Sequence, residues 1–247
     1  MSTLRNLSLL ALPLLSHLSM AQPVVIDFEG LPSMPHSPPG QNVPDAARLS
    51  AGFAAVGVVF ASEADHVAVV HLGEGHATSG VLGIAGVAPD NTLSYAKNIY
   101  ITFVSPDDSE VPAITSSVSI RGDLGGNPDQ SVTMRAFDWW GRLLGEVTAP
   151  DSGGQTLSLQ ADGIHGVTIV GTTDVGGVAW DDLVFETVVP IDPCLPDLTG
   201  DGQVNTLDFL LFLGAWAQRE PFADWDGNGT INTQDFLAYL NDWVAGC

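Results

Sequence analysis

The C-terminal part of the chain carries the same acidic pattern twice, and this repeat constrains the fold more than any other feature. The first copy spans residues 197–208 and reads DLTGDGQVNTLD, and the second spans 224–235 and reads DWDGNGTINTQD. Equivalent residues lie 27 positions apart, as from Asp197 to Asp224, and an apolar segment follows each copy. One copy alone would be compatible with a chance acidic turn, whereas two copies in the same register indicate a duplicated structural unit.

Oxygen-bearing side chains recur at positions 1, 3, 5, 9 and 12 of both segments, which is the ligand pattern of an EF-hand calcium loop. Ca²⁺ takes about six to eight oxygen ligands, and position 7 adds a backbone carbonyl. Gly202 and Gly229 occupy position 6, where the loop turns sharply. The pattern therefore predicts two calcium ions. The expected ligands are Asp197, Thr199, Asp201, Gln203, Asn205 and Asp208 in the first loop, and Asp224, Asp226, Asn228, Thr230, Asn232 and Asp235 in the second.

Each loop is followed by apolar residues at i, i+3, i+4 and i+7, which predicts one amphipathic helix after each loop. These residues are Phe209, Phe212, Leu213 and Trp216 after the first loop, and Phe236, Tyr239, Leu240 and Trp243 after the second. Prolines at 190, 193 and 196 exclude a helix before the first loop.

A calcium loop followed by a single exit helix, present twice and closed by aspartate at position 12, resembles the type I dockerin module. The resemblance covers residues 194–247, and the final Gly-Cys resembles the GC-type dockerin-anchored bacterial proteins. It implies a small α-helical module of two half EF-hands that docks onto a cohesin-like or cell-envelope protein. The implied partner-binding residues are Thr206, Leu207, Thr233 and Gln234. Gly214 and Asn241 stand where that family usually has a basic residue, which is a departure from the cellulosomal pattern.

The two cysteines of the chain, Cys194 and Cys247, bracket this module. In an oxidising exterior we expect them to form a disulfide that joins the ends of a module too small to bury a large core. The alternative is that Cys247 is an attachment point at the cell surface.

The chain is strongly acidic, with 7 lysines and arginines against 29 aspartates and glutamates and a formal net charge of −22. Repulsion by this charge disfavours nucleic acid and anionic membranes as partners.

Residues 1–21 have the features of a secretory signal peptide: a basic residue, Arg5, an apolar stretch at 7–18, and small residues before Gln22. No apolar run is long enough to predict a transmembrane helix. We therefore expect a protein that is secreted and is extracellular or associated with the cell surface.

Residues 22–189 consist of short segments rich in β-branched and aromatic residues, separated by turns of Gly, Pro, Asp and Asn. The expected strands are 24–28, 57–61, 66–71, 98–103, 117–122, 131–137, 143–147, 156–159, 166–170 and 177–186. The pattern predicts a mainly β domain, an antiparallel β-sandwich of jelly-roll type. Residues 190–193 are expected to act as a stiff hinge before the module.

Two sets of residues in this domain are candidate sites. The segments around residues 26–30 and 178–183 resemble the first and last strands of secreted bacterial sandwich domains, some of which share a structural calcium there. By that resemblance Asp27, Glu29, Asp181 and Asp182 hold a third ion, and the alternative is that they are solvated acids at a sheet edge. Trp139 and Trp140 lie in an expected hairpin turn, where an exposed indole would offer a platform for a sugar ring. The favoured alternative is that they fold back onto the sandwich.

The sequence contains no hydrolase signature and no evident catalytic cysteine, so we expect a protein that is not an enzyme. The preferred hypothesis is a secreted β-sandwich docked to a partner through the calcium-dependent module. The alternative is a carbohydrate-binding component of an extracellular complex that degrades polysaccharides, with a glycan as ligand of the sandwich.

Overall fold

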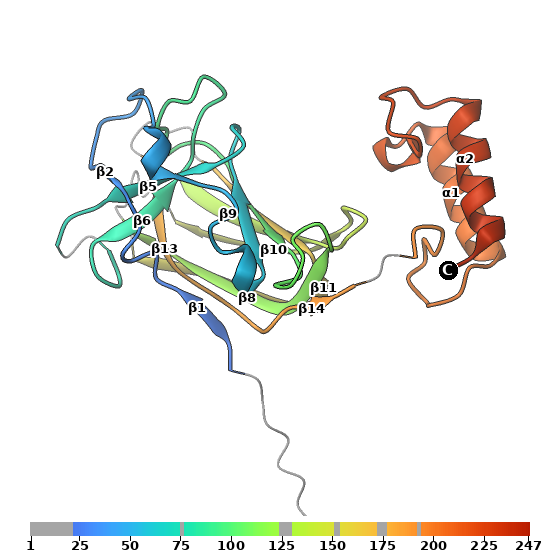
Figure 1. Cartoon of the computed structure of the whole chain (residues 1–247), viewed down its shortest axis with the longest axis horizontal. Helices are drawn as coiled ribbons and strands as arrows, with labels where there is room; N and C mark the ends of the chain where they lie inside the picture. Colours follow the sequence, from blue (N-terminus) through green and yellow to red (C-terminus); the bar gives the residue numbers. More distant parts are fainter. Residues whose placement is uncertain (1–21, 75–76, 124–129, 151–153, 172–176, 192–193) are drawn as a thin grey trace, which may run out of the picture.

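The computed structural model describes residues 22–74, 77–123, 130–150, 154–171, 177–191 and 194–247, and every structural statement below refers to these ranges. They form two β-sheets followed by two α-helices (Figure 1). The expected signal peptide lies outside the described residues.

The strands and helices have the following bounds. The strands are β1 (Val24–Ile26), β2 (Met34–Pro35), β3 (Arg48–Leu49), β4 (Val58–Ala61), β5 (Val67–His71), β6 (Leu82–Ala85), β7 (Ile99–Phe103), β8 (Ala113–Asp123), β9 (Ser131–Phe137), β10 (Leu143–Pro150), β11 (Gln155–Ile164), β12 (Gly166–Val170), β13 (Ala179–Phe185) and β14 (Val189–Pro190). The α-helices are α1 (Thr206–Gln218) and α2 (Thr233–Ala245), and the short 3-10 helices are η1 (Asp45–Ala47), η2 (Ala54–Val56) and η3 (Pro221–Ala223).

The two sheets pack face to face as a sandwich. One has the strand order β11-β8-β13-β6-β5-β2, with β1 on β13 and β3 on β5, and the other has the order β10-β9-β12-β7-β4. The paired strands are antiparallel except for β2 and β5. The expectation of a mainly β, antiparallel sandwich is confirmed at this level. Each of the ten expected strands corresponds to a strand, and β2, β3, β6 and β14 are additional.

Alternating residues of each sheet point into one shared apolar core. Val132, Met134 and Ala136 of β9 are buried there, as their alternation predicts. From the opposite sheet, Ile120 of β8 and Leu157 of β11 enter the same core. The burial of these side chains is the main force that holds the two sheets together.

Strands β5 and β6 are buried on both faces, so their sequences do not alternate between apolar and polar residues. Val67 and Val69 face the shared core, whereas Ala68 and Val70 belong to a second apolar cluster on the opposite face. Segments that connect the strands supply the cover of this cluster. The covering residues are Met34, Val43, Ala47, Val87, Leu93 and Tyr95.

The end of the sandwich differs from the expected boundary. Pro190 is part of β14, which pairs with β8, and the Ile191 amide donates to the Pro112 carbonyl at 2.9 Å. The first half of the expected hinge is therefore attached to the sheet by hydrogen bonds, and residues 192–193 lie outside the described ranges.

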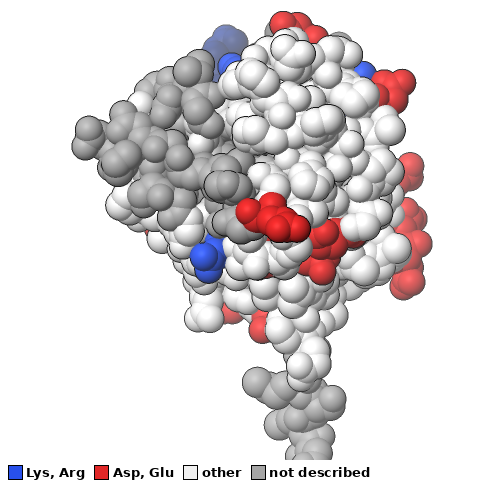
Figure 2. Space-filling model, turned by 90° about the vertical axis from the view of Figure 1, so that its left-hand side faces the viewer, with Lys and Arg blue, Asp and Glu red and all other residues white. Residues whose placement is uncertain are grey.

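Acidic side chains outnumber basic ones on the surface of the sandwich shown in Figure 2, in keeping with the composition. Within the described part of the chain, no helix has the length and apolarity needed to cross a membrane.

Candidate metal centre

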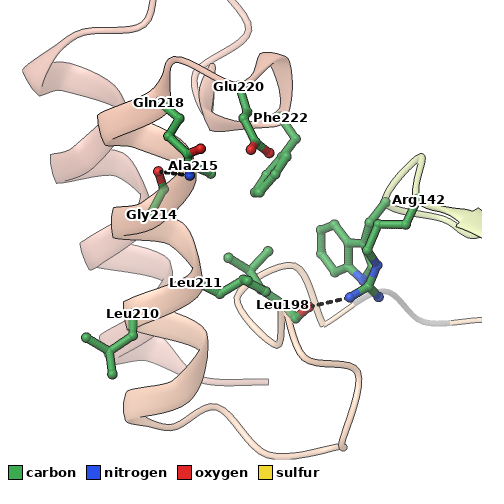
Figure 3. Close-up of a pocket in the computed structure, with 10 residues that line it drawn as sticks. Arg142, Leu198, Leu210, Leu211, Gly214, Ala215, Gln218, Glu220 and Phe222 are labelled. Carbon is green, nitrogen blue, oxygen red and sulfur yellow. Dashed lines mark hydrogen bonds between the residues drawn. The ribbon is translucent and has the colours of Figure 1, made fainter.

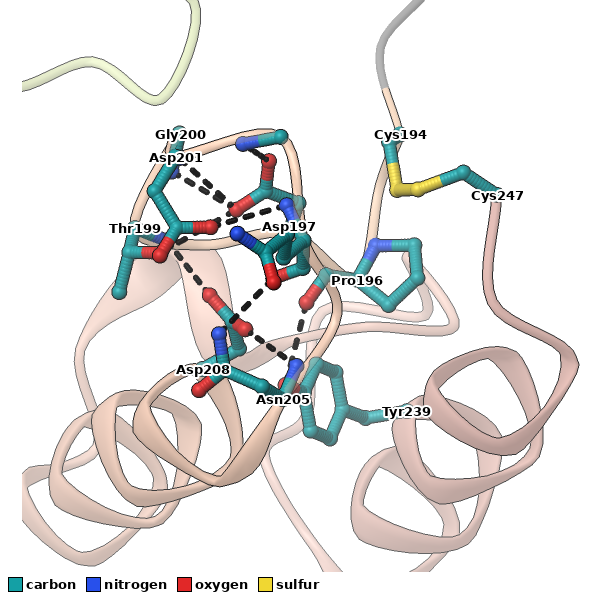
Figure 4. The surroundings of a disulfide bond; sticks show 12 residues. Cys194, Pro196, Asp197, Thr199, Gly200, Asp201, Asn205, Asp208, Tyr239 and Cys247 are labelled. Carbon is teal, nitrogen blue, oxygen red and sulfur yellow. Dashed lines mark hydrogen bonds between the residues drawn. A yellow bond between two sulfur atoms is a disulfide. The ribbon is translucent and has the colours of Figure 1, made fainter.

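The C-terminal module consists of two loop–helix units whose ends are joined covalently. Cys194 and Cys247 form a disulfide with a Cα–Cα distance of 5.2 Å (Figure 4). Among the described residues no helix lies directly before the first loop, and α1 and α2 begin at position 10 of the two loops, in keeping with one helix per loop. The bond makes Cys247 part of a clasp, which is the first of the two alternatives for this residue.

The second loop gathers three carboxylates around one point. Ligand oxygens of Asp224, Asp226 and Asp235 all lie within 4.8 Å of one another. Among the described residues this is the one group of three acidic, histidine or cysteine side chains close enough to share an ion. The three residues stand at positions 1, 3 and 12 of the loop.

One oxygen of this group has no hydrogen-bond partner. Asp224 Oδ2 accepts from the Gly229 amide at 2.8 Å, whereas Asp224 Oδ1 is buried and unpaired. A buried carboxylate oxygen without a partner is costly unless a cation or a donor satisfies it. The donor set consists of oxygen atoms only, which suits a hard cation such as Ca²⁺ or Mg²⁺.

The first loop has the same backbone arrangement, with its three carboxylates at partly different positions. The carboxylate of Asp208 accepts from the amides of Thr199 and Asn205, both at 2.8 Å. In the second loop Asp235 accepts from the equivalent amides, those of residues 226 and 232, at 3.2 and 2.7 Å. Thr199 stands at position 3 where the second loop has an aspartate, and Asp201 stands at position 5 where the second loop has Asn228, so each loop brings three carboxylates (Figure 4).

The turns and helix starts of the two loops also match. Gly202 and Gly229 have φ angles of 81° and 82°, in the left-handed region that glycine enters without strain. Asn205 and Asn232 cap the two helices, and each forms a capping box with the aspartate three residues later. These local interactions fix the position-9 and position-12 side chains before any ion is considered.

One tryptophan of each helix forms a hydrogen bond to the loop of the other unit. The sequence analysis did not predict these bonds. Trp216 of α1 donates from its indole nitrogen to the Asn232 carbonyl at 2.8 Å, and Trp243 of α2 donates to the Asn205 carbonyl at 2.8 Å. The two donors are 27 residues apart, and so are the two acceptors. The 27-residue repeat could therefore have indicated that these tryptophans have equivalent roles. Because the acceptors stand at position 9 of the loops, each loop is held by the helix of the other unit.

Hydrogen bonds and burial set the ionisation of the groups in the module. Amide hydrogen bonds, led by that of Asn232, lower the pKa of Asp235. For Asp208, burial acts in the opposite direction, but the amides of Asn205 and Thr199 outweigh it and lower the pKa. Burial raises the pKa of Tyr239, and the charges of Asp208 and Asp197 raise it further. The closing carboxylates of both loops are therefore held in their charged forms.

The residues expected to bind a partner lie on the surface at the start of the helices. Thr206 and Leu207 are exposed in the first turn of α1, and Thr233 and Gln234 are exposed in the first turn of α2. These four residues are therefore accessible to a partner, and each pair occupies the same position in its unit.

Three of the four acids considered for a third ion accept hydrogen bonds from backbone amides. Asp181 is buried and accepts from the amides of Ser79 at 2.9 Å and Asp182 at 2.7 Å. Glu29 accepts from the amides at 81 and 82, both at 2.7 Å. Asp27 is exposed and accepts from the amide of Glu29 at 3.1 Å. Glu29 and Asp181 thus fasten the segment 78–82 to the sheet, a role that neither alternative had included.

The two tryptophans of the expected hairpin turn pack against different parts of the chain. The Trp139 ring lies edge-on to His165, with 4.8 Å between ring centroids, and Trp140 packs against the apolar cluster of the C-terminal module. The turn has the expected form, since the Gly141 amide donates to the Asp138 carbonyl and Gly141 has a φ of 76°. Trp139 thus packs on the sandwich, as the structural alternative expected, whereas Trp140 packs on the module, which neither alternative included.

Comparisons with known proteins give distant likenesses. No family model and no curated protein matches the chain. The C-terminal domain of a chitobiase from Bacteroides fragilis is 13% identical, with 39% of this chain and 65% of that chain covered and a TM-score of 0.24. TmCBM61 in complex with β-1,4-galactotriose is 13% identical, with coverages of 62% and 99% and a TM-score of 0.28. The enzymatically active domain of tailspike protein 4 from bacteriophage CBA120 is 11% identical, with coverages of 61% and 21% and a TM-score of 0.25. TM-scores this low assign neither a fold family nor a function.

The disulfide generates the first prediction. Replacing both Cys194 and Cys247 by serine should lower the free energy of unfolding of the module by about 4 kcal/mol, because the bond closes a loop of 53 residues in the unfolded chain. Chemical denaturation followed by the helical circular dichroism signal measures this loss. Alkylation of the unreduced wild-type protein should add no mass, and two adducts would contradict the pairing.

The second prediction concerns the buried carboxylate of Asp181. Asp181→Ala leaves the amides of Ser79 and Asp182 without this acceptor, so the free energy of unfolding of the sandwich should fall by about 3 kcal/mol. Asp162→Ala, at an exposed position, is the matched control and should change it by less than about 0.5 kcal/mol. Urea denaturation of the wild-type protein and both variants measures these changes. Equal midpoints for the wild type and Asp181→Ala would show that the contacts of Asp181 are not stabilising.

Proposed function

We propose that residues 194–247 form a calcium-dependent docking module of the dockerin kind. In this proposal the β-sandwich is not an enzyme, is secreted, and is attached by the module to a cohesin-like or cell-envelope protein. The observation that carries the proposal is the cluster of Asp224, Asp226 and Asp235 with its unpaired buried oxygen. The repeat places an equivalent loop 27 residues earlier, and this duplication is what the resemblance to type I dockerins requires.

Calcium supplies the positive charge that the module lacks. From residue 194 onward the chain has eight acidic residues and a single basic one, Arg219. Asp197, Asp201 and Asp208 in the first loop, and Asp224, Asp226 and Asp235 in the second, would hold the ions together with the neutral oxygens at positions 7 and 9. Neutralising clustered carboxylates stabilises the folded module, so the binding free energy contributes directly to folding.

Docking would use the exposed first turns of α1 and α2. Thr206 and Leu207 on one helix and Thr233 and Gln234 on the other carry no charge. A partner surface that binds them therefore needs no compensating charge at its centre, in contrast to the acidic remainder of the module.

Removal of calcium should unfold the module while the sandwich stays folded. The helices of the described chain longer than one turn belong to the module, so chelation of the full-length protein should remove most of its helical circular dichroism signal. The β-sheet signal should persist, and added Ca²⁺ should restore the helical one. A helical signal that is unchanged in chelator would contradict the proposal.

Single ligand replacements should separate the two sites. Asp224→Ala should reduce the calcium stoichiometry measured by calorimetry from two to one, because it removes the position-1 ligand of the second loop. Glu220→Gln, an exposed charge outside both loops, should leave the stoichiometry at two. Two ions bound with equal affinity to the Asp224 variant would exclude this residue as a ligand.

A second candidate function is glycan binding by the sandwich, favoured by a polar row on the outer face of the five-stranded sheet. Strand register aligns Tyr100 of β7, Thr168 of β12, Arg135 of β9 and Glu146 of β10 across four neighbouring strands. Arg135 Nε donates to Glu146 at 3.2 Å, which keeps both side chains in the plane of this face. One aromatic ring beside hydroxyl and charged groups is an arrangement suited to a sugar.

This second candidate predicts that Tyr100→Ala weakens binding of any glycan retained on an array by about tenfold or more, because the aromatic ring supplies most of the contact area. Trp139→Ala, which changes an aromatic contact away from this row, is the control and should retain binding. An array on which the wild-type protein retains no glycan would exclude the candidate.

A further inference from the structure

The hairpin tip of the sandwich touches the C-terminal module at the first loop. Trp140 packs against the apolar cluster of the module, which includes Leu198 and Ala215. Arg142 Nη1 donates to the Leu198 carbonyl at 3.4 Å (Figure 3). Leu198 stands between Asp197 and Thr199, two of the expected calcium ligands, so the contact reaches the loop itself.

Hydrogen bonds within the hairpin tip fix its conformation. Asp138 accepts from the amides of Trp140 at 2.9 Å and Arg142 at 2.8 Å, and from Arg142 Nε at 2.7 Å. A carboxylate that binds both the backbone and the guanidinium orients the arginine before it meets the module. The hairpin therefore loses little conformational freedom when it makes the contact.

The two repeats differ where the tip lies. At position 2 of the loops the first repeat has Leu198, whereas the second has Trp225, which packs against Tyr239 and donates to Asp242 at 2.9 Å. The residue equivalent to Asp242 in the first repeat is Ala215. The first repeat thus lacks its own tryptophan and carboxylate at this point, and Trp140 of the sandwich brings an indole there.

The tip also covers one side of α1. Between them lies a groove of about 260 Å³, with Trp140 and Arg142 on the sandwich side and Leu211 and Gly214 on the helix side (Figure 3). Leu211 remains 41% exposed, so the tip covers this face without filling it. A side chain at Gly214 would meet no atom within 4 Å, so the groove is open at this position.

We propose that the hairpin tip 138–142 is an intramolecular partner of the first repeat, a latch that fixes the sandwich against the calcium-loaded module. The difference between the repeats then determines which repeat binds the hairpin. The first repeat is adapted to this chain's own hairpin, and the corresponding face of the second repeat is left for other contacts. The involvement of calcium rests on the function proposed above, whereas the contact itself does not.

Small-angle X-ray scattering of the full-length protein in calcium tests the latch. Trp140→Ala should increase the radius of gyration and broaden the distribution of distances between the two domains, because it removes the apolar part of the contact and leaves only the hydrogen bond of Arg142. Trp139→Ala is the matched control, since Trp139 packs within the sandwich, and should leave the scattering unchanged.

A second pair of variants approaches the contact from the module. Leu211→Asp places a charge in the groove and should expand the protein as Trp140→Ala does, whereas Leu237→Asp, an exposed leucine of the second repeat, should not. Calorimetry on the same samples reports calcium binding separately. Scattering that is identical for wild type, Trp140→Ala and Leu211→Asp would overturn the latch, whether or not the loops bind calcium. Wild type that binds no calcium would overturn the proposed function.

Discussion

The crowding of carboxylates in a small module is the constraint on which the C-terminal structure depends. Asp224, Asp226 and Asp235 approach within 4.8 Å of one another, although like charges at that distance repel strongly. Amide hydrogen bonds hold the closing aspartates, Asp208 and Asp235, in position and lower their pKa values, which favours their charged forms. In the proposed function, a bound divalent cation would remove this conflict, and the loop turns and capping boxes would place its ligands.

The module compensates for its small core by connections between its two halves. The disulfide joins the ends of the chain, and Trp216 and Trp243 cross from each helix to the opposite loop. The stacked rings of Phe212 and Tyr239, with centroids 4.0 Å apart, fill the space between the helices. Each loop–helix unit is therefore packed and hydrogen-bonded to the other.

The sequence pattern predicted those features of the structure that depend on interactions between residues close in sequence. The alternation around Met134, the capping boxes of the loops and the helix starts after Asn205 and Asn232 all follow from residues close in sequence. Strand β6 was missed because both of its faces are buried, which removes the alternation. The roles of Asp181 and of Trp140 depend on segments about 60 to 100 residues away, and nothing near them in the sequence indicates those partners.

The central claim is that both loops hold calcium, and anomalous X-ray diffraction from crystals grown in calcium tests it most directly. The account predicts two anomalous peaks per chain, one bounded by Asp197 and Asp208 and the other by Asp224 and Asp235, each surrounded by oxygen atoms at about 2.3–2.6 Å. Well-ordered loops with no anomalous peak in either of them would contradict it.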